Sequence, residues 1–185
     1  MKIVAQRNPT FGEYRTYFHI TLAELSNLSL NRSFVLERRH SSLTSLKHRY
    51  WLVQTENVRG VITMNEEYET KYFCNSAEEW KAEGVEQLRL STVDLTGVPS
   101  LENLHRGVEF ALSHREKGSS VYVHCKAGRC RSATLAAAYI IRIHCWSPEE
   151  ACQMLASVRP HVIIRSAQLE MLRRYHQQVC GGGSI

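Results

Sequence analysis

The stretch HCKAGRCRS at residues 124–132 holds residue types that phosphate chemistry requires. A thiol becomes a good nucleophile when it ionises, and a helix N-terminus with nearby cations lowers the pKa of cysteine from about 8.5 to roughly 3.5–7.5. Backbone N–H groups at such a terminus also bind a tetrahedral anion. We therefore expect Cys125 to act as a nucleophile and Arg131 to grip phosphate oxygens with its planar guanidinium.

The remaining residues of this stretch fit the same chemistry. Ser132 can donate a hydrogen bond to the thiolate, and His124 can brace the loop through backbone carbonyls. Gly128 permits a positive φ and a close approach of the backbone to a bound anion. The residues expected to surround the phosphate are Lys126, Ala127, Gly128, Arg129 and Cys130. An inert buried cysteine beside an arginine is the alternative, and the spacing of four residue types makes it the weaker one.

The neighbouring elements are expected to present the thiol at the end of a strand. Residues 120–124 form a short apolar run, and residues 132–144 are small and apolar, which indicates a central helix. Two earlier runs, 58–64 and 85–91, are also predicted strands. The other predicted helices span residues 76–84, 100–114, 147–158 and 168–179. Strands that alternate with helices indicate an α/β fold with a mostly parallel central sheet flanked by helices.

Capping signals support two of these helices. Ser76 is followed three residues later by Glu79, and Ser147 by Glu150, which is the pattern of a capping box. Gly84 is expected to end the first of these helices. In the helix at 100–114, the apolar residues that share one face are Leu101, Leu104, Val108 and Leu112.

The bulk composition agrees with one globular domain. The chain has 185 residues, 43% of them hydrophobic, and no apolar run long enough to span a membrane. A net charge of +5 favours an anionic partner without choosing between phosphate, a lipid surface and nucleic acid. The six cysteines show no metal-binding spacing, so most are expected to be small buried side chains in a reducing compartment. Basic residues are scattered near the N-terminus, and a transit peptide therefore remains one interpretation of this region.

The pattern H-C-x5-R-S resembles the signature of the protein tyrosine phosphatase superfamily, in its compact dual-specificity branch. Longer stretches, including ENVRGVITMNEEYET and VYVHCKAGRCRSAT, resemble the mitochondrial tyrosine-phosphatase-like phosphatidylglycerophosphatase family over about residues 52–178. The resemblance implies a compact dual-specificity-phosphatase-like fold and hydrolysis of phosphatidylglycerophosphate to phosphatidylglycerol for cardiolipin synthesis. It also implies a cysteinyl-phosphate intermediate, no metal or other cofactor, and a location on the matrix face of the mitochondrial inner membrane.

The resemblance assigns catalytic roles residue by residue. Cys125 attacks phosphorus, and Arg131 stabilises the transferring group. In this branch a general acid lies about thirty residues before the cysteine, and Asp94 in STVDLTGVP lies 31 positions before Cys125. Asp94 is thus expected to protonate the leaving oxygen and then to activate water. The alternative is a turn aspartate without a catalytic role, because aspartate favours turns in any case.

The acidic stretch EEYE has two interpretations. Glu66, Glu67 and Glu69 follow a predicted strand, which is typical of a solvated acidic turn. They are also suited to anchor Arg131 or a neighbouring arginine, or to exclude wrong substrates. The family resemblance places this stretch beside the active site and favours a functional role.

Two features depart from the family pattern. Cys130 stands where the family has serine, which is either a tolerated small-residue change or a thiol that traps oxidised Cys125 as a disulfide. Residues 1–51 do not resemble the N-terminal region of the family, which has an apolar leading segment and an early strand that ends in a GALP-like turn. The turn is not found here, and if the early strand is missing, a sheet edge is exposed and stability falls. We therefore predict an atypical N-terminal segment at 1–51, a phosphatase domain at 52–179 and a flexible tail at 180–185.

The predicted partner is an anionic phospholipid at a membrane surface, with phosphoproteins as a second substrate class and no nucleic acid. Lys126 and Arg129 add two cations to the loop, which either bind the second phosphate of a lipid headgroup or lie in solvent. Rival functions are a dual-specificity protein phosphatase and a non-catalytic phosphate-binding module disabled by its altered N-terminus. A rhodanese-like or arsenate-reductase-like loop is disfavoured by His124 and by the upstream Asp94.

Overall fold

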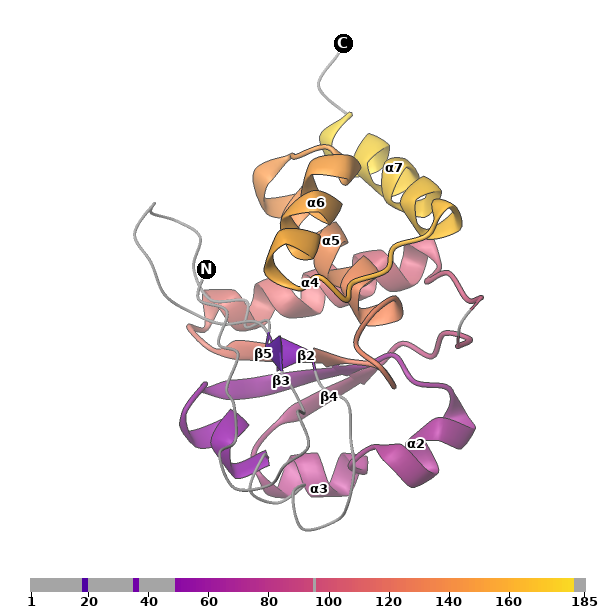
Figure 1. Cartoon of the computed structure of the whole chain (residues 1–185). Helices are drawn as coiled ribbons and strands as arrows, with labels where there is room; N and C mark the ends of the chain where they lie inside the picture. Colours follow the sequence, from indigo (N-terminus) through magenta and orange to yellow (C-terminus); the bar gives the residue numbers. More distant parts are fainter. Residues whose placement is uncertain (1–17, 20–34, 37–48, 95, 182–185) are drawn as a thin grey trace.

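A parallel three-stranded sheet forms the centre of the protein (Figure 1). The computed structural model describes residues 18–19, 35–36, 49–94 and 96–181. In chain order, the strands of the central sheet are β3 (Val58–Thr63), β4 (Glu86–Arg89) and β5 (Ser120–His124). β3 lies in the middle, and its Ile62 pairs with Leu88 on one side and with Val123 on the other. The three predicted strands and their parallel arrangement are confirmed.

Helices cover both faces of the sheet (Figure 1). One face carries four long helices, which are α4 (Leu101–Glu116), α5 (Arg131–His144), α6 (Pro148–Val158) and α7 (Ser166–Cys180). The opposite face carries the helical residues 49–54 and two short helices, α2 (Glu67–Phe73) and α3 (Ala77–Ala82). α5 is the central helix, because α4, α6 and α7 all pack against it.

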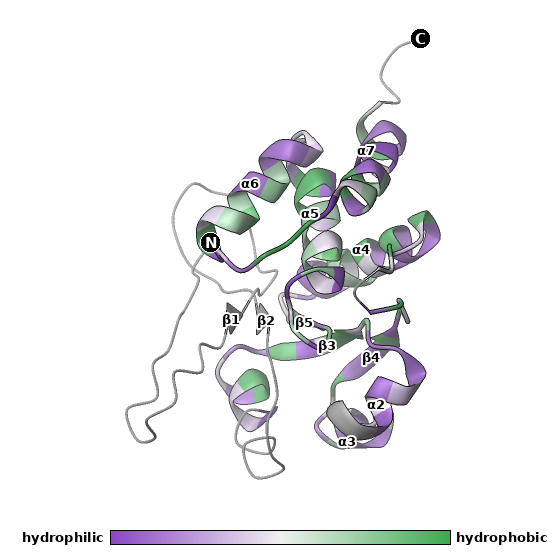
Figure 2. Ribbon diagram, turned by 45° about the vertical axis from the view of Figure 1, so that its right-hand side comes forward, coloured by the Kyte–Doolittle hydropathy of each residue, from purple (hydrophilic) through white to green (hydrophobic). Residues whose placement is uncertain are grey.

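The two faces of the strands pack into two separate hydrophobic clusters. In β3, Val61 joins the cluster on the side of α3 and Ile62 the cluster on the side of α5, as the two-residue repeat of a strand requires. Trp80 of α3 is 2% exposed and packs in the smaller cluster with Tyr122 of β5. Figure 2 shows hydrophobic colouring on α5 and on part of β3, whereas α7 carries both colours. The sheet is thus covered on both sides, as parallel sheets usually are.

Local side chains set the starts of α3 and α6. Ser76 Oγ accepts a hydrogen bond from the N–H of Glu79, whose carboxylate in turn accepts one from the N–H of Ser76. Ser147 and Glu150 form the same reciprocal cap at α6. Both predicted capping boxes are therefore confirmed, and Gly84 adopts a φ of +70° just beyond the end of α3.

Helices α7 and α2 differ from the sequence prediction in a way that their caps explain. α7 begins at Ser166, two residues early, because the side chain of Gln168 accepts a hydrogen bond from the N–H of Arg165 and caps the helix there. α2 was not predicted as a helix. It begins after Glu66, whose backbone N–H donates to the carboxylate of Glu69 at 2.8 Å. This cap converts the expected acidic turn into a first helical turn.

Two short strands lie beside the central sheet. β1 (Phe18–His19) and β2 (Val35–Leu36) pair antiparallel, and β2 lies next to β5 (Figure 1). The other residues of the predicted N-terminal segment, and residues 182–185 of the predicted tail, lie outside the described residues. The three predicted domain boundaries therefore stay predictions. Among the helices that the structure describes, none combines the length and the apolar character of a membrane span.

Candidate active site

The loop between β5 and α5 wraps around the thiol of Cys125. Cys125 follows directly on β5 and is 5% exposed, and α5 begins at Arg131. Gly128 adopts a φ of +59°, the positive value expected from the sequence. Ser132 lies in the first turn of α5, with its Oγ 3.2 Å from Cys125 Sγ. The thiol therefore lies beside a hydroxyl and close to the positive end of a 14-residue helix.

Arg131 is held by groups from separate segments of the chain. Its guanidinium is 2% exposed and donates to Glu69, with Nη1–Oε2 at 2.7 Å and Nη2–Oε1 at 3.3 Å. Nη1 also donates to the carbonyl oxygen of Thr92 at 2.9 Å. Burial by itself lowers the pKa of Arg131, but the hydrogen bond to Glu69 and neighbouring negative charges raise it overall above its usual value. The guanidinium thus remains charged and fixed in orientation.

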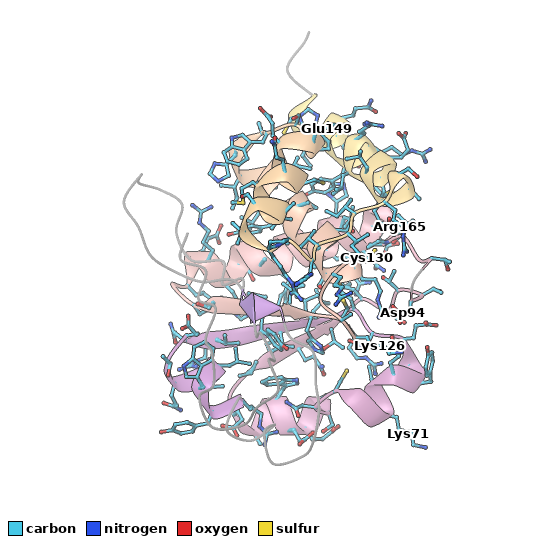
Figure 3. All side chains as sticks on the ribbon, in the orientation of Figure 1. Lys71, Asp94, Lys126, Cys130, Glu149 and Arg165 are labelled. Carbon is cyan, nitrogen blue, oxygen red and sulfur yellow. The ribbon has the colours of Figure 1, made fainter. Side chains whose placement is uncertain are left out.

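Asp94 lies on the loop after β4 and reaches the same guanidinium. Its Oδ1 is 2.8 Å from Arg131 Nη2, and its Oδ2 is 3.6 Å from Lys126 Nζ. The backbone N–H of Asp94 donates to Glu66 Oε1 at 2.9 Å, which ties the loop to the start of α2. Figure 3 shows Asp94, Lys126 and Cys130 gathered at one end of the sheet. The structure therefore places the predicted general acid at the β5–α5 loop.

The three carboxylates of the acidic stretch have different environments. Glu69 is completely buried and binds Arg131, so the interpretation as a solvated turn is wrong for this residue. Glu66 caps α2. The side chain of Glu67 is 86% exposed and pairs with Arg89 at 2.8 Å. The helical geometry of α2 explains the difference, because successive residues of a helix point in different directions.

His124 supports the loop from the last position of β5. Its Nε2 is 2.8 Å from Thr63 Oγ1 on β3, and its ring stacks on Tyr122 with ring centroids 5.0 Å apart. Thr63 Oγ1 also accepts a hydrogen bond from Gln87 of β4 at 2.8 Å. The three strands are thus tied together where the loop begins. This partner of His124 is a hydroxyl on the neighbouring strand, and the contact with backbone carbonyls of the loop stays a prediction.

The segment after α6 also contacts the loop, which the sequence did not predict. Arg159 is 7% exposed, and its Nη2 donates to the carbonyl oxygen of Ala127 at 3.2 Å. Burial lowers the pKa of Arg159 to about 10. The N–H of Ile163 donates to the carbonyl oxygen of Arg129 at 2.8 Å. One signal in the sequence could have indicated this contact. Arg159 lies just after a predicted helix and before Pro160, so the amphipathic pattern of the helix does not account for it.

The remaining loop side chains differ in exposure. Lys126 and Arg129 are exposed, and the binding of a second phosphate by them stays a prediction. Cys130 is partly buried, and its pKa is raised, first by burial and then by the charge of Cys125. For Cys130, the tolerated small-residue change and the thiol that traps oxidised Cys125 therefore both stay predictions.

The domain that carries this loop matches a known protein family. Residues 50–178 match the family model described as the dual specificity phosphatase catalytic domain, which is more than half of the chain. The chain belongs to the dual specificity phosphatase family. Its sheet and flanking helices are therefore those of a dual specificity phosphatase catalytic domain, and the predicted fold class is confirmed.

Relatives within the dual specificity phosphatases have high sequence identity to this chain. The rat protein named phosphatidylglycerophosphatase and protein-tyrosine phosphatase 1 is 64% identical over 128 residues, which cover 69% of this chain and 66% of the rat protein. The human protein of the same name is 62% identical over 128 residues, which cover 69% of this chain and 64% of the human protein. The aligned segment thus spans slightly less than two thirds of these curated relatives. The crystal structure of PTPMT1 in complex with PI(5)P has a TM-score of 0.74 and 54% identity, and the match covers 81% of this chain and 94% of that chain.

Proposed function

We propose that the protein is a cysteine-dependent phosphatase that hydrolyses phosphatidylglycerophosphate to phosphatidylglycerol. The reaction type is supported above all by the convergence of Cys125, Arg131 and Asp94 on one loop. The lipid substrate is supported by the names of the rat and human relatives, which are 64% and 62% identical to this chain. A further support is the complex of PTPMT1 with PI(5)P, because PI(5)P is also a phospholipid.

The proposed reaction has two steps. The Cys125 thiolate attacks phosphorus while Arg131 and backbone N–H groups of the loop bind the equatorial oxygens. Asp94 gives its proton to the leaving glycerol oxygen, so that a cysteinyl-phosphate and a free alcohol form. The Asp94 carboxylate then takes a proton from water, whose oxygen attacks phosphorus and releases the thiolate. Ser132, 3.2 Å from the sulfur, stabilises that thiolate as it leaves.

Substrate binding must change the partner of Asp94. In the structure its carboxylate lies 2.8 Å from Nη2 of Arg131. A phosphate that is held by two nitrogens of Arg131 needs this one, because Nη1 already donates to Glu69 and to the carbonyl of Thr92. The substrate thus separates the Asp94 carboxyl group from Arg131 and frees it to contact the leaving oxygen.

Exposed apolar side chains near the site suit a substrate embedded in a membrane. Tyr68 in α2, Val93 beside the general acid and Ile163 behind the loop are 56%, 55% and 45% exposed. Lys126 and Arg129 add positive charge on the loop. Apolar groups beside cations match the acyl chains and phosphates of an anionic bilayer. This surface supports our proposal that the protein works at an anionic membrane, and the family resemblance of the sequence is the support for the matrix face of the mitochondrial inner membrane.

The proposed substrate is tested by a direct comparison of two phosphate donors. We expect kcat/KM for phosphatidylglycerophosphate in vesicles to exceed that for a phosphotyrosine peptide at least about tenfold, because the apolar and basic surface contacts only the lipid. The measurement is release of inorganic phosphate by the full-length protein. Cys125→Ser serves as the blank for both substrates.

Two other outcomes of this comparison would point to a different function. Faster hydrolysis of the peptide would favour a dual specificity protein phosphatase, which the second half of the relatives' name supports. Release from neither substrate, by protein that is folded and binds inorganic phosphate, would favour the non-catalytic module. Either result would overturn the proposed lipid function.

Asp94→Asn provides a separate test of the general acid. It is expected to lower kcat for the lipid about 10²–10³-fold but to lower kcat for an activated aryl phosphate less than about tenfold. A glycerol oxygen needs a proton to leave, whereas a nitrophenolate leaves without one. The substitution also removes the ion pair with Arg131, so KM is not expected to rise. Equal losses of kcat on the two substrates would contradict the assignment.

A further inference from the structure

The thiols of Cys145 and Cys180 lie in direct contact at the end of α5 remote from the phosphate loop. Cys145 directly follows α5 and has a φ of +49°, and Cys180 is the last residue of α7. Their sulfur atoms are 2.9 Å apart. Cys180 Sγ also lies 3.8 Å from the carbonyl oxygen of Ile141, which places it over the last turn of α5. In the structure both residues are free cysteines.

The surroundings of this pair make it accessible to small reagents. The expectation that most cysteines are buried is wrong, because Cys125 alone of the six is buried and Cys145 is exposed. Cys145 and Cys180 are not fully buried because both lie at the ends of helices. The pKa of Cys180 is raised to about 11, first by burial and then by its hydrogen bond with Cys145, while the nearby Arg142 opposes the shift. Cys145 is therefore the member that a dissolved oxidant reaches first.

We propose that Cys145 and Cys180 form an intramolecular disulfide when the protein meets a two-electron oxidant such as hydrogen peroxide. A disulfide has an S–S distance of about 2.05 Å, so the two sulfurs must approach by only roughly 0.9 Å from their separation of 2.9 Å. The Cys145 thiolate attacks one peroxide oxygen, becomes a sulfenic acid and releases hydroxide, which leaves as water with the thiol proton. The Cys180 sulfur then attacks the sulfenic sulfur, and the S–S bond forms as a second water leaves. The two thiols lose two electrons, and the peroxide gains them.

The helices already hold the two cysteines together, so the disulfide can form without a change in the packing of α7 on α5. α7 already packs against α5, with Leu172 and Ile141 fully buried (Figure 1). The disulfide would join residues 35 positions apart and close a loop that contains all of α6 and α7. A cross-link of this length restricts the unfolded chain, so we expect Tm to rise by about 10 °C.

The test maps the thiols of the folded, full-length protein after mild treatment with peroxide. Free thiols are alkylated, and cleavage after Arg142 and Arg174 gives one peptide with Cys145 and Cys152 and a C-terminal peptide with Cys180. We expect the two peptides to be joined and two hydrogens lighter than their sum. Because Cys152 shares the first peptide, Cys152→Ser must keep the link and Cys145→Ser must lose it.

Three results would overturn the proposal. One is a sulfinic acid at Cys145 with Cys180 still alkylated. Another is a link found only in covalent dimers. The third is a Tm that rises on oxidation as much in Cys145→Ser as in the unsubstituted protein. Peptide mass and Tm do not depend on phosphatase activity, so failure of the proposed lipid function would leave this test unaffected.

Discussion

Cys125→Ser is expected to lower kcat at least about 10⁴-fold on every phosphate monoester, because loss of a nucleophile removes the covalent route. A hydroxyl in this position is not ionised at neutral pH, and an alkoxide leaves phosphorus poorly in the second step. The loop, Arg131 and the start of α5 are unchanged, so inorganic phosphate should still bind. The measurement is kcat on the lipid and on an aryl phosphate, with phosphate binding followed by calorimetry.

The matched control for this change is Cys152→Ser. It makes the same thiol-to-hydroxyl replacement at a partly buried position on α6, outside the phosphate loop. We expect kcat to stay within about twofold of the unsubstituted protein. Turnover by Cys125→Ser above the level of contaminating phosphatase would show that another group acts as the nucleophile.

Among these substitutions, Glu69→Gln is expected to have the largest effect on stability, with a loss of about 3 kcal/mol in the free energy of unfolding. Arg131 is 2% exposed and Glu69 is fully buried, so the change leaves a buried guanidinium without its main counter-ion. Glutamine retains the volume and an oxygen that can accept the hydrogen bond from the N–H of Glu66, so the cap of α2 survives. We also expect kcat/KM to fall about 100-fold, because the guanidinium loses its fixed orientation. Urea unfolding and steady-state kinetics measure the two effects.

Glu67→Gln is the control for the charge change itself. It makes the same substitution two residues earlier, on a side chain that is 86% exposed and pairs with Arg89 at the surface. An exposed ion pair contributes little, so we expect less than about 1 kcal/mol and unchanged kinetics. Similar effects of the two substitutions would contradict a special role for the buried pair.

The sequence predicted those parts of the fold whose signals are local. The reciprocal caps at Ser76 and Ser147 involve residues three positions apart, and both appear in the structure. The strand that ends at His124 and the helix that follows the loop were also readable from short apolar runs. The positive φ of Gly128 followed from the same short stretch. Each of these features depends on residues that are neighbours in the chain.

The features that the sequence left open depend on distant partners. Glu69 and Arg131 are 62 positions apart, and no periodic pattern shows which of three nearby glutamates turns inward. Arg159 meets the loop only after α6 has packed against α5. The contact between Cys145 and Cys180 likewise depends on how α7 lies along α5. Tertiary packing, rather than propensity, decides all three.

The same difference in chain separation bears on the order in which the protein folds. α5, α6 and α7 are consecutive and pack against one another, so their contacts close short stretches of chain. The ion pair between Arg131 and Glu69 closes 62 positions, and parallel strands need long connections as well. Contacts at short separation form faster than those at long separation. We therefore expect the three C-terminal helices to assemble early and the ion pair between Arg131 and Glu69 to form late. Molecules with formed helices that do not yet bind phosphate should then precede the mature protein.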